Sequence, residues 1–271
     1  MRLSAAAGPS GIGPATGIAL TWRLCWHDTL PSTSDACIEA AMRGEPAGLV
    51  ILARAQTAAR GSRGRSWTSI PGNLLLSVLL RPRRHAAEAS RFALLAGVAL
   101  AETLQAMLAD PASVTLKWPN DLLLDGRKLA GILVDSAATP EGRIDWLVIG
   151  IGVNLVAAPE GTDTPAIALS TRMPLGGVPA VKTVADALLA RLGAWLAIEA
   201  AQGFAPVRAA WMGRAAPPGT SIGFRHGTAR ITGRFAGIDA EGALLIEEEQ
   251  GALRRFSSGE VLDPATPRTE G

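Results

Sequence analysis

The sequence contains few cysteines and histidines and no large excess of either charge. Its two cysteines, Cys25 and Cys37, cannot form a disulfide framework, and its three histidines supply no cluster at metal-ligand spacing. The 26 basic and 24 acidic residues leave a net charge of +2, so no global field draws the protein to nucleic acid. We therefore expect buried thiols, and we expect any electropositive site to be local.

Long hydrophobic runs are also absent. The longest apolar stretches, 74–80 and 147–153, are strand-sized and much shorter than the roughly 20 residues that cross a bilayer. The N-terminus lacks the apolar core of a signal peptide, so the sequence predicts a cytoplasmic protein that does not enter a membrane. Residues 1–20 are rich in Gly, Ala, Pro and Ser without periodicity, which predicts a disordered tail with no room for a DNA-reading helix-turn-helix.

The composition is typical of a globular protein, with 48% hydrophobic and 18% charged residues. Short apolar runs alternate with segments of 3.6-residue periodicity, which predicts an α+β fold with helices packed on the faces of one sheet. Asp125-Gly126 lies between two apolar runs and predicts a type I′ hairpin. The expected strands are 22–26, 49–53, 74–80, 114–117, 129–134 and 146–153, and the expected helices are 34–42, 89–108 and 182–201.

The pattern changes after Trp211. Pro217-Pro218-Gly219 interrupts the chain, and three short strands follow at 229–235, 243–247 and 253–257. A module of about 45 residues is marginal alone, so we expect a compact β-barrel packed on the larger domain. The predicted organisation is a tail at 1–20, a larger domain at 21–214 and a C-terminal β module at 215–271.

Two apparent motifs fail the test of context. Residues 219–223 match the Gly-x-Ser-x-Gly nucleophile elbow, but a β pattern follows where that motif requires a helix. Gly150-x-Gly152 resembles half of a dinucleotide fingerprint, yet Leu155 occupies the third glycine position. A Gly-x-x-x-x-Gly-Lys-Ser/Thr phosphate loop does not occur.

A loop of alternating glycine and arginine, 56–67, follows directly after the strand at 49–53. The loop carries Arg60, Arg63 and Arg65 and ends at Trp67. Backbone N–H groups and guanidinium groups in such a loop can converge on phosphate or carboxylate oxygens. A solvated basic loop or an unspecific RNA-binding segment is the alternative from composition alone. Because Trp67 and then 71–73 lead into a buried strand, the loop is fixed at both ends, which favours a preorganised anion site.

A second motif, 117–121, is followed after the hairpin turn by Lys128 at the head of an apolar strand. A lysine whose stem enters a core is costly unless its ammonium meets an anion, such as a bound phosphate or carboxylate. Asn120 offers an amide for recognition, and Asp121 offers a hard oxygen ligand for Mg²⁺. Taken alone, Lys128 is also compatible with a surface lysine beside a turn, and Asn120 and Asp121 are compatible with an Asx turn after proline.

Two further segments complete the candidate site. Gly150 and Gly152, at the end of a buried strand, allow a flat ligand or another backbone to approach closely, and Asn154 follows them. Residues 31–35 form a helix N-cap signature, whose hydroxyl and N–H groups can bind a polar head group.

These blocks, in this order, resemble biotin protein ligases, which attach biotin to a lysine of a carrier protein. The resemblance implies a mixed sheet flanked by helices, the class II synthetase-like fold, with a small C-terminal SH3-like β-barrel. It also implies ATP and biotin as substrates, Mg²⁺, a biotin carboxyl carrier protein as acceptor, and a monomer or homodimer. Regulatory members carry an N-terminal DNA-binding domain, for which this sequence has no room. A lipoate or octanoate ligase of the same fold and a non-catalytic biotin-binding module remain the alternatives.

The resemblance also implies roles for individual residues. Lys128 and Arg60 would be catalytic, with Lys128 bridging the biotin carboxylate and the α-phosphate, and Asp121 would bind Mg²⁺. Biotin contacts are implied for Ser32, Thr33, Ser34, Gln56, Arg60, Gly61, Ser62, Lys128 and Gly131, and ATP contacts for Arg63, Arg65, Trp67, Asn120, Lys128 and Asn154.

The sequence departs from the family pattern at three positions. Ala59 replaces a glycine, Ser34 stands where asparagine is common, and Ser62 replaces an arginine that helps to close the loop over the adenylate. We therefore expect faster release of biotinyl-AMP and some labelling of bystander lysines, unless Arg63 compensates.

Overall fold

The computed structural model describes residues 20–162, 164–174, 177–249 and 251–262. The predicted tail at 1–20 lies outside these residues, except for Leu20. No helix in the described part of the chain is long and apolar enough to cross a membrane.

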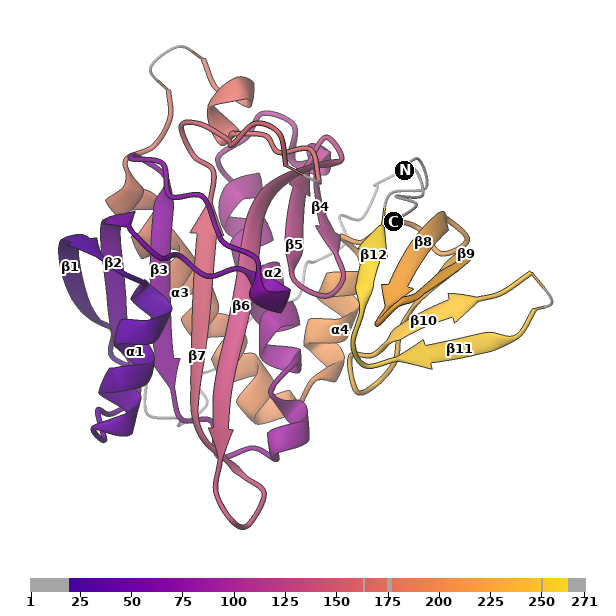
Figure 1. Cartoon of the computed structure of the whole chain (residues 1–271), viewed down its shortest axis with the longest axis horizontal. Coiled ribbons are helices and arrows are strands. Elements are labelled where there is room, and N and C mark those ends of the chain that lie inside the picture. The colour runs from indigo at the N-terminus through magenta and orange to yellow at the C-terminus, as the bar shows by residue number, and fades with distance from the viewer. Residues whose placement is uncertain (1–19, 163, 175–176, 250, 263–271) are drawn as a thin grey trace, which may run out of the picture.

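A seven-stranded sheet forms the centre of the larger domain (Figure 1). Its strand order is β1-β2-β3-β7-β6-β5-β4. β1 pairs with β2 in parallel and every other neighbouring pair is antiparallel, so the expected mixed sheet is confirmed. The strands are β1 (Arg23–Leu30), β2 (Leu49–Gln56), β3 (Leu74–Leu80), β4 (Val114–Lys117), β5 (Asp121–Leu124), β6 (Arg127–Ala138) and β7 (Ile144–Val153).

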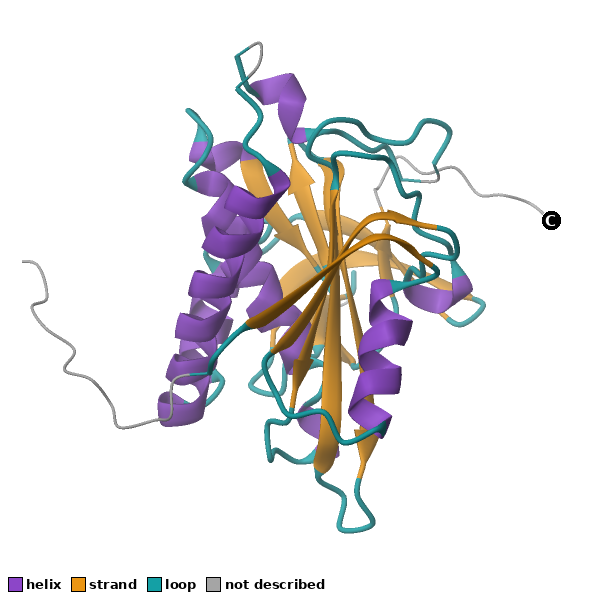
Figure 2. Ribbon diagram, turned by 90° about the vertical axis from the view of Figure 1, so that its left-hand side faces the viewer, coloured by secondary structure: helices purple, strands orange, loops and turns teal. Residues whose placement is uncertain are grey.

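Helices cover both faces of this sheet (Figure 2). α1 packs on β2, β3 and β7, whereas α2 packs on β4, β5, β6 and β7, and α3 lies against α2 and β3. The sequence pattern explains this arrangement, because alternate strand residues face opposite layers. In β2, Val50 and Leu52 join the core beneath α2 and α3, while Ile51 joins Cys37 beneath α1. The helices are α1 (Thr33–Met42), α2 (Arg91–Gln105), α3 (Val181–Gln202) and α4 (Ala205–Met212), with short 3₁₀ turns at Ser62–Gly64, Ala86–Glu88, Pro111–Ser113 and Leu169–Arg172.

Local signals for helix α1 and for the β5–β6 hairpin are confirmed. The Ser32 side chain caps α1 by accepting a hydrogen bond from the backbone N–H of Asp35. Asp125 and Gly126 have φ values of 51° and 73°, as a type I′ turn requires at its two central positions. Cys37 is buried as expected, and this burial raises the pKa of its thiol to about 12. The expectation of a buried thiol is wrong for Cys25, which is exposed on the edge strand β1.

The C-terminal module is an open five-stranded antiparallel sheet with strand order β11-β10-β9-β8-β12. The expected closed barrel is wrong, because β11 and β12 form two unpaired edges of the sheet among the described residues. β12 is only three residues long, and its Glu260 contacts Arg65 of the Gly/Arg loop rather than β11. The expected strands at 229–235, 243–247 and 253–257 correspond to three of the five. The strands are β8 (Ser221–His226), β9 (Ala229–Ile238), β10 (Leu244–Glu247), β11 (Leu253–Phe256) and β12 (Glu260–Leu262).

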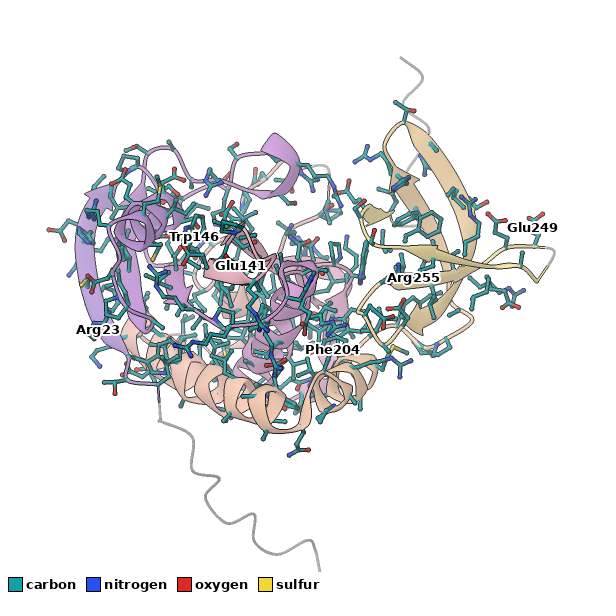
Figure 3. The ribbon with its side chains drawn as sticks, turned by 90° about the horizontal axis from the view of Figure 1, so that it is seen from below. Arg23, Glu141, Trp146, Phe204, Glu249 and Arg255 are labelled. Atoms are coloured by element: carbon teal, nitrogen blue, oxygen red, sulfur yellow. The ribbon has the colours of Figure 1, made fainter. Side chains whose placement is uncertain are left out.

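The module packs against the larger domain next to α4, with Phe204 at the junction (Figure 3). Trp118 of the second motif is buried there, where its Nε1 donates a hydrogen bond to the Gly242 carbonyl at 3.0 Å. Its ring lies 6.1 Å from that of Phe224 on β8. Ser221 begins β8 rather than a helix, which confirms that the Gly-x-Ser-x-Gly match is not a nucleophile elbow.

Candidate active site

Two cavities meet between the Gly/Arg loop and the start of β6. The inner cavity, of about 50 Å³, lies between the N-terminal turn of α1 and strands β6 and β7. The outer cavity, of about 500 Å³, lies between the Gly/Arg loop and residues 159–162 and 164–166. Gly61, Ser62, Trp67 and Lys128 line both cavities. Two ligands bound side by side would therefore meet at these four residues.

Lys128 lies at the boundary between the two cavities. Its Nζ is 2.6 Å from Asp121 Oδ1 and 5.9 Å from the centre of the Trp67 ring. Lys117 Nζ lies 3.6 Å from the other carboxylate oxygen of Asp121. The antiparallel pairing of β4, β5 and β6 brings these three residues together. Two ammonium groups share one carboxylate, so a surplus positive charge remains for an anionic ligand.

Trp67 closes the inner cavity from the side of the Gly/Arg loop. Its ring rests on two strand glycines: a Cβ on Gly152 would lie 2.6 Å from Trp67 Cε2, and a Cβ on Gly131 would lie 3.1 Å from Cζ3. The indole Nε1 is buried and has no hydrogen-bond partner among the described residues. A buried N–H without a partner is costly, so an acceptor atom of a ligand would stabilise it.

Arg60 ties the loop to both α1 and β6. Its Nε lies 2.8 Å from Asp35 Oδ1 and its Nη2 lies 2.8 Å from Asp135 Oδ2. Partial burial lowers the pKa of Arg60, but the hydrogen bond and charge of Asp135, together with the charge of Asp35, outweigh that effect and leave the pKa above its usual value. Arg60 therefore stays charged and holds the loop over the inner cavity.

The other two loop arginines contact the C-terminal module. Arg65 Nη1 lies 2.9 Å and Arg63 Nη1 lies 3.3 Å from the carboxylate of Glu260 on β12, which Arg225 of β8 also contacts. Arg63 also donates a hydrogen bond to the Gly259 carbonyl. Burial raises the pKa of Glu260, but the hydrogen bond from Arg225 and the charge of Arg65 outweigh it, so the pKa lies below its usual value. Three arginines around one carboxylate again leave surplus positive charge.

Comparison with known proteins identifies the relatives of this chain. Residues 28–154 match the Biotin/lipoate A/B protein ligase family, and residues 222–262 match the Biotin protein ligase C terminal domain. The biotin--[acetyl-CoA-carboxylase] ligase of Paracoccus denitrificans is 39% identical over 204 residues, which cover 74% of this chain and 85% of that protein. The chain belongs to the biotin protein ligase family.

Other members of the family share most of the chain. The bifunctional ligase/repressor BirA of Bacillus subtilis is 32% identical over 238 residues, covering 87% of this chain and 72% of that protein. The structure of biotin protein ligase from Aquifex aeolicus in complex with biotin and ATP superimposes with a TM-score of 0.74 at 27% identity, covering 88% of this chain and 97% of that one.

The residues expected to contact biotin in a biotin protein ligase are brought together. All of them line the inner cavity: Ser32, Thr33, Ser34, Gln56, Arg60, Gly61, Ser62, Lys128 and Gly131. The residues expected to contact ATP are divided. Arg65, Trp67, Lys128 and Asn154 line the outer cavity, Asn120 lines the inner cavity, and Arg63 is directed to Glu260.

Asn120 and Asn154 are held by the fold of the biotin protein ligase domain. Asn120 Nδ2 donates a hydrogen bond to the Ile132 carbonyl at 2.6 Å, which fixes the start of β5 against β6. Asn154 Oδ1 accepts a hydrogen bond from Asn73 Nδ2 at 3.4 Å. Both amides therefore shape the cavities through contacts with the backbone and with neighbouring side chains.

Several residues of the site were not predicted from the sequence. Ser77 lies behind the inner cavity, Glu260 contacts the loop arginines, and the segment made of 159–162 and 164–166 forms one wall of the outer cavity. The backbone of Lys128 pairs with the end of that segment and the residue after it, donating to the Pro165 carbonyl at 2.8 Å and accepting from the Ile167 N–H at 3.0 Å. A local sequence signal exists only for the segment, whose Pro, Gly and Thr residues mark it as a loop.

Proposed function

We propose that this protein is an ATP-dependent biotin protein ligase. In the first step an oxygen of the biotin carboxylate attacks the α-phosphorus of ATP, and pyrophosphate leaves. In the second step the amine of a carrier lysine attacks the acyl carbon of biotinyl-AMP, AMP leaves, and the amine loses a proton. Family membership and the names of the relatives, several of which are biotin ligases, support this assignment.

The observation that carries the proposal is the position of Lys128 in the wall shared by two cavities. A carboxylate in the inner cavity and an α-phosphate in the outer cavity repel each other. An ammonium at the boundary offsets that repulsion, and its stabilisation grows as negative charge shifts toward pyrophosphate in the transition state. Asp121, 2.6 Å from Nζ, holds the ammonium in place before the substrates bind.

We assign biotin to the inner cavity and the nucleotide to the outer cavity. The inner cavity has polar groups at one end, from Ser32, Thr33, Ser34 and Gln56, and an apolar wall from β6 and β7. This combination suits a ligand with a polar ring and an apolar chain. The outer cavity is the larger and has Arg65 and Asn154 in its wall, which suits a nucleotide phosphate. Arg60 acts by holding the loop closed, and Trp67 offers its unpartnered N–H to the ligand.

The surroundings of Asp121 do not favour a resident Mg²⁺. Its carboxylate is paired with Lys128 and Lys117, and no group of three or more His, Cys, Asp or Glu side chains in the described ranges could hold a metal ion. A divalent cation at Asp121 would lie beside two ammonium groups. We therefore assign Asp121 to orienting Lys128. Mg²⁺ would enter the site bound to the ATP phosphates, as their counter-ion.

The proposed acceptor is a biotin carboxyl carrier protein of a biotin-dependent carboxylase, acting in the cytoplasm. The Paracoccus denitrificans relative is named as a ligase for acetyl-CoA carboxylase. The fold leaves the second step accessible, because the outer cavity opens beside the exposed segment 160–162. We propose that the enzyme works as a monomer or a homodimer.

The test is substrate-dependent exchange of labelled pyrophosphate into ATP by the full chain. We expect exchange with biotin and at least about 100-fold slower exchange with lipoate or octanoate, because the polar end of the inner cavity would be left unpaired by either alternative. Faster exchange with lipoate or octanoate would reassign the substrate. Biotin binding without exchange would show a non-catalytic binding module.

A further inference from the structure

Ser77 is a buried hydroxyl in an otherwise apolar strand. β3 reads Leu-Leu-Leu-Ser-Val-Leu-Leu, and all seven residues are buried. The Ser77 side chain is 0% exposed and lies behind the wall of the inner cavity, on the side of α1. A buried hydroxyl costs stability unless it is hydrogen-bonded, so its partners indicate what it does.

The partners of Ser77 are two hydroxyls that line the inner cavity. Ser77 Oγ donates to Thr33 Oγ1 at 2.8 Å, and it lies 3.1 Å from Ser34 Oγ. A serine hydroxyl has one hydrogen. Because that hydrogen goes to Thr33, the bond between Ser34 and Ser77 must use the hydrogen of Ser34. The chain of hydroxyls therefore runs from Ser34 to Ser77 to Thr33.

This direction gives the two cavity-lining hydroxyls opposite characters. Thr33 receives a hydrogen from Ser77, so its own hydrogen is available to a ligand in the cavity. Ser34 gives its hydrogen to Ser77, so its lone pairs face the ligand. Thr33 and Ser34 are 3% and 6% exposed, so competition from bulk water is limited. Gly150 leaves room for this chain, since a Cβ there would lie 2.4 Å from Ser34 Oγ.

We propose that Ser77 is a positioning residue that fixes Thr33 as a hydrogen-bond donor and Ser34 as an acceptor toward the ligand. The pair then fits a head group in which a carbonyl oxygen lies next to an N–H, as in a cyclic urea. A head group that offers only donors fits poorly, because it meets the hydrogen of Thr33. This inference rests on the proposed function, because it takes the inner cavity to be the biotin site.

The experiment measures the affinities of the full chain for biotin and for 2-iminobiotin at pH 7 by calorimetry. In 2-iminobiotin a protonated guanidinium replaces the urea, so the carbonyl acceptor becomes a donor. We expect wild type to prefer biotin. In Ser77→Ala the Thr33 hydroxyl can rotate to accept, so we expect the ratio of the two affinities to fall about three- to tenfold. Thr33→Val removes the final donor, and the double variant should then give the same ratio as Thr33→Val alone.

Thr103→Val is the matched control. Thr103 is also 0% exposed and donates to the Ala99 carbonyl, but it lies within α2, away from the cavity lining. We expect its affinity ratio to equal that of wild type. If Ser77→Ala weakens both ligands equally, so that the ratio is unchanged, Ser77 has only a packing role and the inference is wrong. If wild type fails to bind biotin at all, the proposed function itself fails.

Discussion

Ser62 stands where the resemblance implies an arginine, and the structure shows what surrounds it. Ser62 lines both cavities, and its Oγ accepts a hydrogen bond from Arg65 Nη2 at 3.4 Å. Arg63, which could have compensated for the missing arginine, instead contacts Glu260 and the Gly259 carbonyl. The loop therefore closes over the cavities without a guanidinium at position 62.

We predict that Ser62→Arg slows the release of biotinyl-AMP. A charge-assisted hydrogen bond to the adenylate would add stabilisation, and we expect about tenfold slower dissociation than from wild type. The measurement is the dissociation rate of the adenylate in a chase experiment, with mass spectrometry of biotinylated bystander lysines. Ser221→Arg, at an exposed position of β8, is the control. Equal dissociation rates in wild type and Ser62→Arg would show that position 62 does not retain the adenylate.

The positions of site residues were predictable where a motif holds several of them close together along the chain. Lys128 was expected at the head of an apolar strand and is the second residue of β6, whereas Gln56 was expected in the loop after residue 53 and is instead the last residue of β2. Arg63 shows the limit of this reasoning. Its sequence context is similar to that of Arg65, and both guanidinium groups meet Glu260, nearly 200 positions away, yet only Arg65 also lines the outer cavity. No local pattern encodes that contact.

At the scale of the elements, the glycines of β7 set how closely the Gly/Arg loop approaches the sheet. Gly150 leaves space for the Ser34 hydroxyl and Gly152 leaves space for the Trp67 ring. Because β7 pairs with β3 and β6 along this whole segment, its backbone cannot withdraw from an added side chain. The two glycines thus determine the shape of the inner cavity.

We predict that Gly152→Ala displaces Trp67 and lowers biotin affinity at least about tenfold. The new Cβ would lie 2.6 Å from Trp67 Cε2, a distance that requires the ring to move, and overpacking of this kind costs about 1–3 kcal/mol. The measurement is biotin affinity by calorimetry. Gly193→Ala on α3 is the control, because its Cβ would come no closer than 3.6 Å to the Trp22 ring and alanine favours a helix. Unchanged biotin binding in Gly152→Ala would contradict this role of the glycine.

The elements of the larger domain were largely predictable, since apolar strands alternate with amphipathic helices. β3 and β4 have the expected bounds, whereas β1 runs on to Leu30, past the expected end at Trp26. β1 is an edge strand with exposed residues such as His27 and Asp28, so its second half lacks an apolar pattern. The strands β8 and β12 and helix α4 were missed, because six, three and eight residues are too few to establish a period.

At the scale of the whole molecule, the C-terminal module is tied to the site on two sides. Trp118 is hydrogen-bonded to the Gly242 carbonyl, and Glu260 is paired with Arg63 and Arg65 of the loop. The ion pairs of Glu260 connect the module directly to the loop that covers both cavities. The module lies beside the larger domain (Figure 1), and through Glu260 it helps to hold the loop in place.

We predict that the stability contributed by Glu260 depends on pH. Its pKa is lower in the folded protein than the usual value of 4.5, so its contribution is complete above that pH and is lost as the pH falls through the folded-state pKa. Glu260→Gln should lower the free energy of unfolding by about 1–2 kcal/mol at pH 7, and this difference should shrink at about pH 4 and below.

Urea unfolding at a series of pH values measures this difference. Glu247→Gln, at an exposed position of β10, is the control and should match wild type at every pH. A destabilisation by Glu260→Gln of the same size at pH 7 and at pH 3 would show that the arginine cluster does not depend on the charge of Glu260.

The most direct test of the account is the effect of Lys128→Ala on biotin-dependent exchange of pyrophosphate into ATP, measured together with biotin binding. The control is Lys182→Ala, which removes an exposed ion pair with Asp186 on α3. We predict that Lys128→Ala lowers exchange at least about 100-fold while the variant still binds biotin, because the ammonium acts mainly on charge that develops in the transition state. Exchange by Lys128→Ala at the rate of wild type would contradict the account.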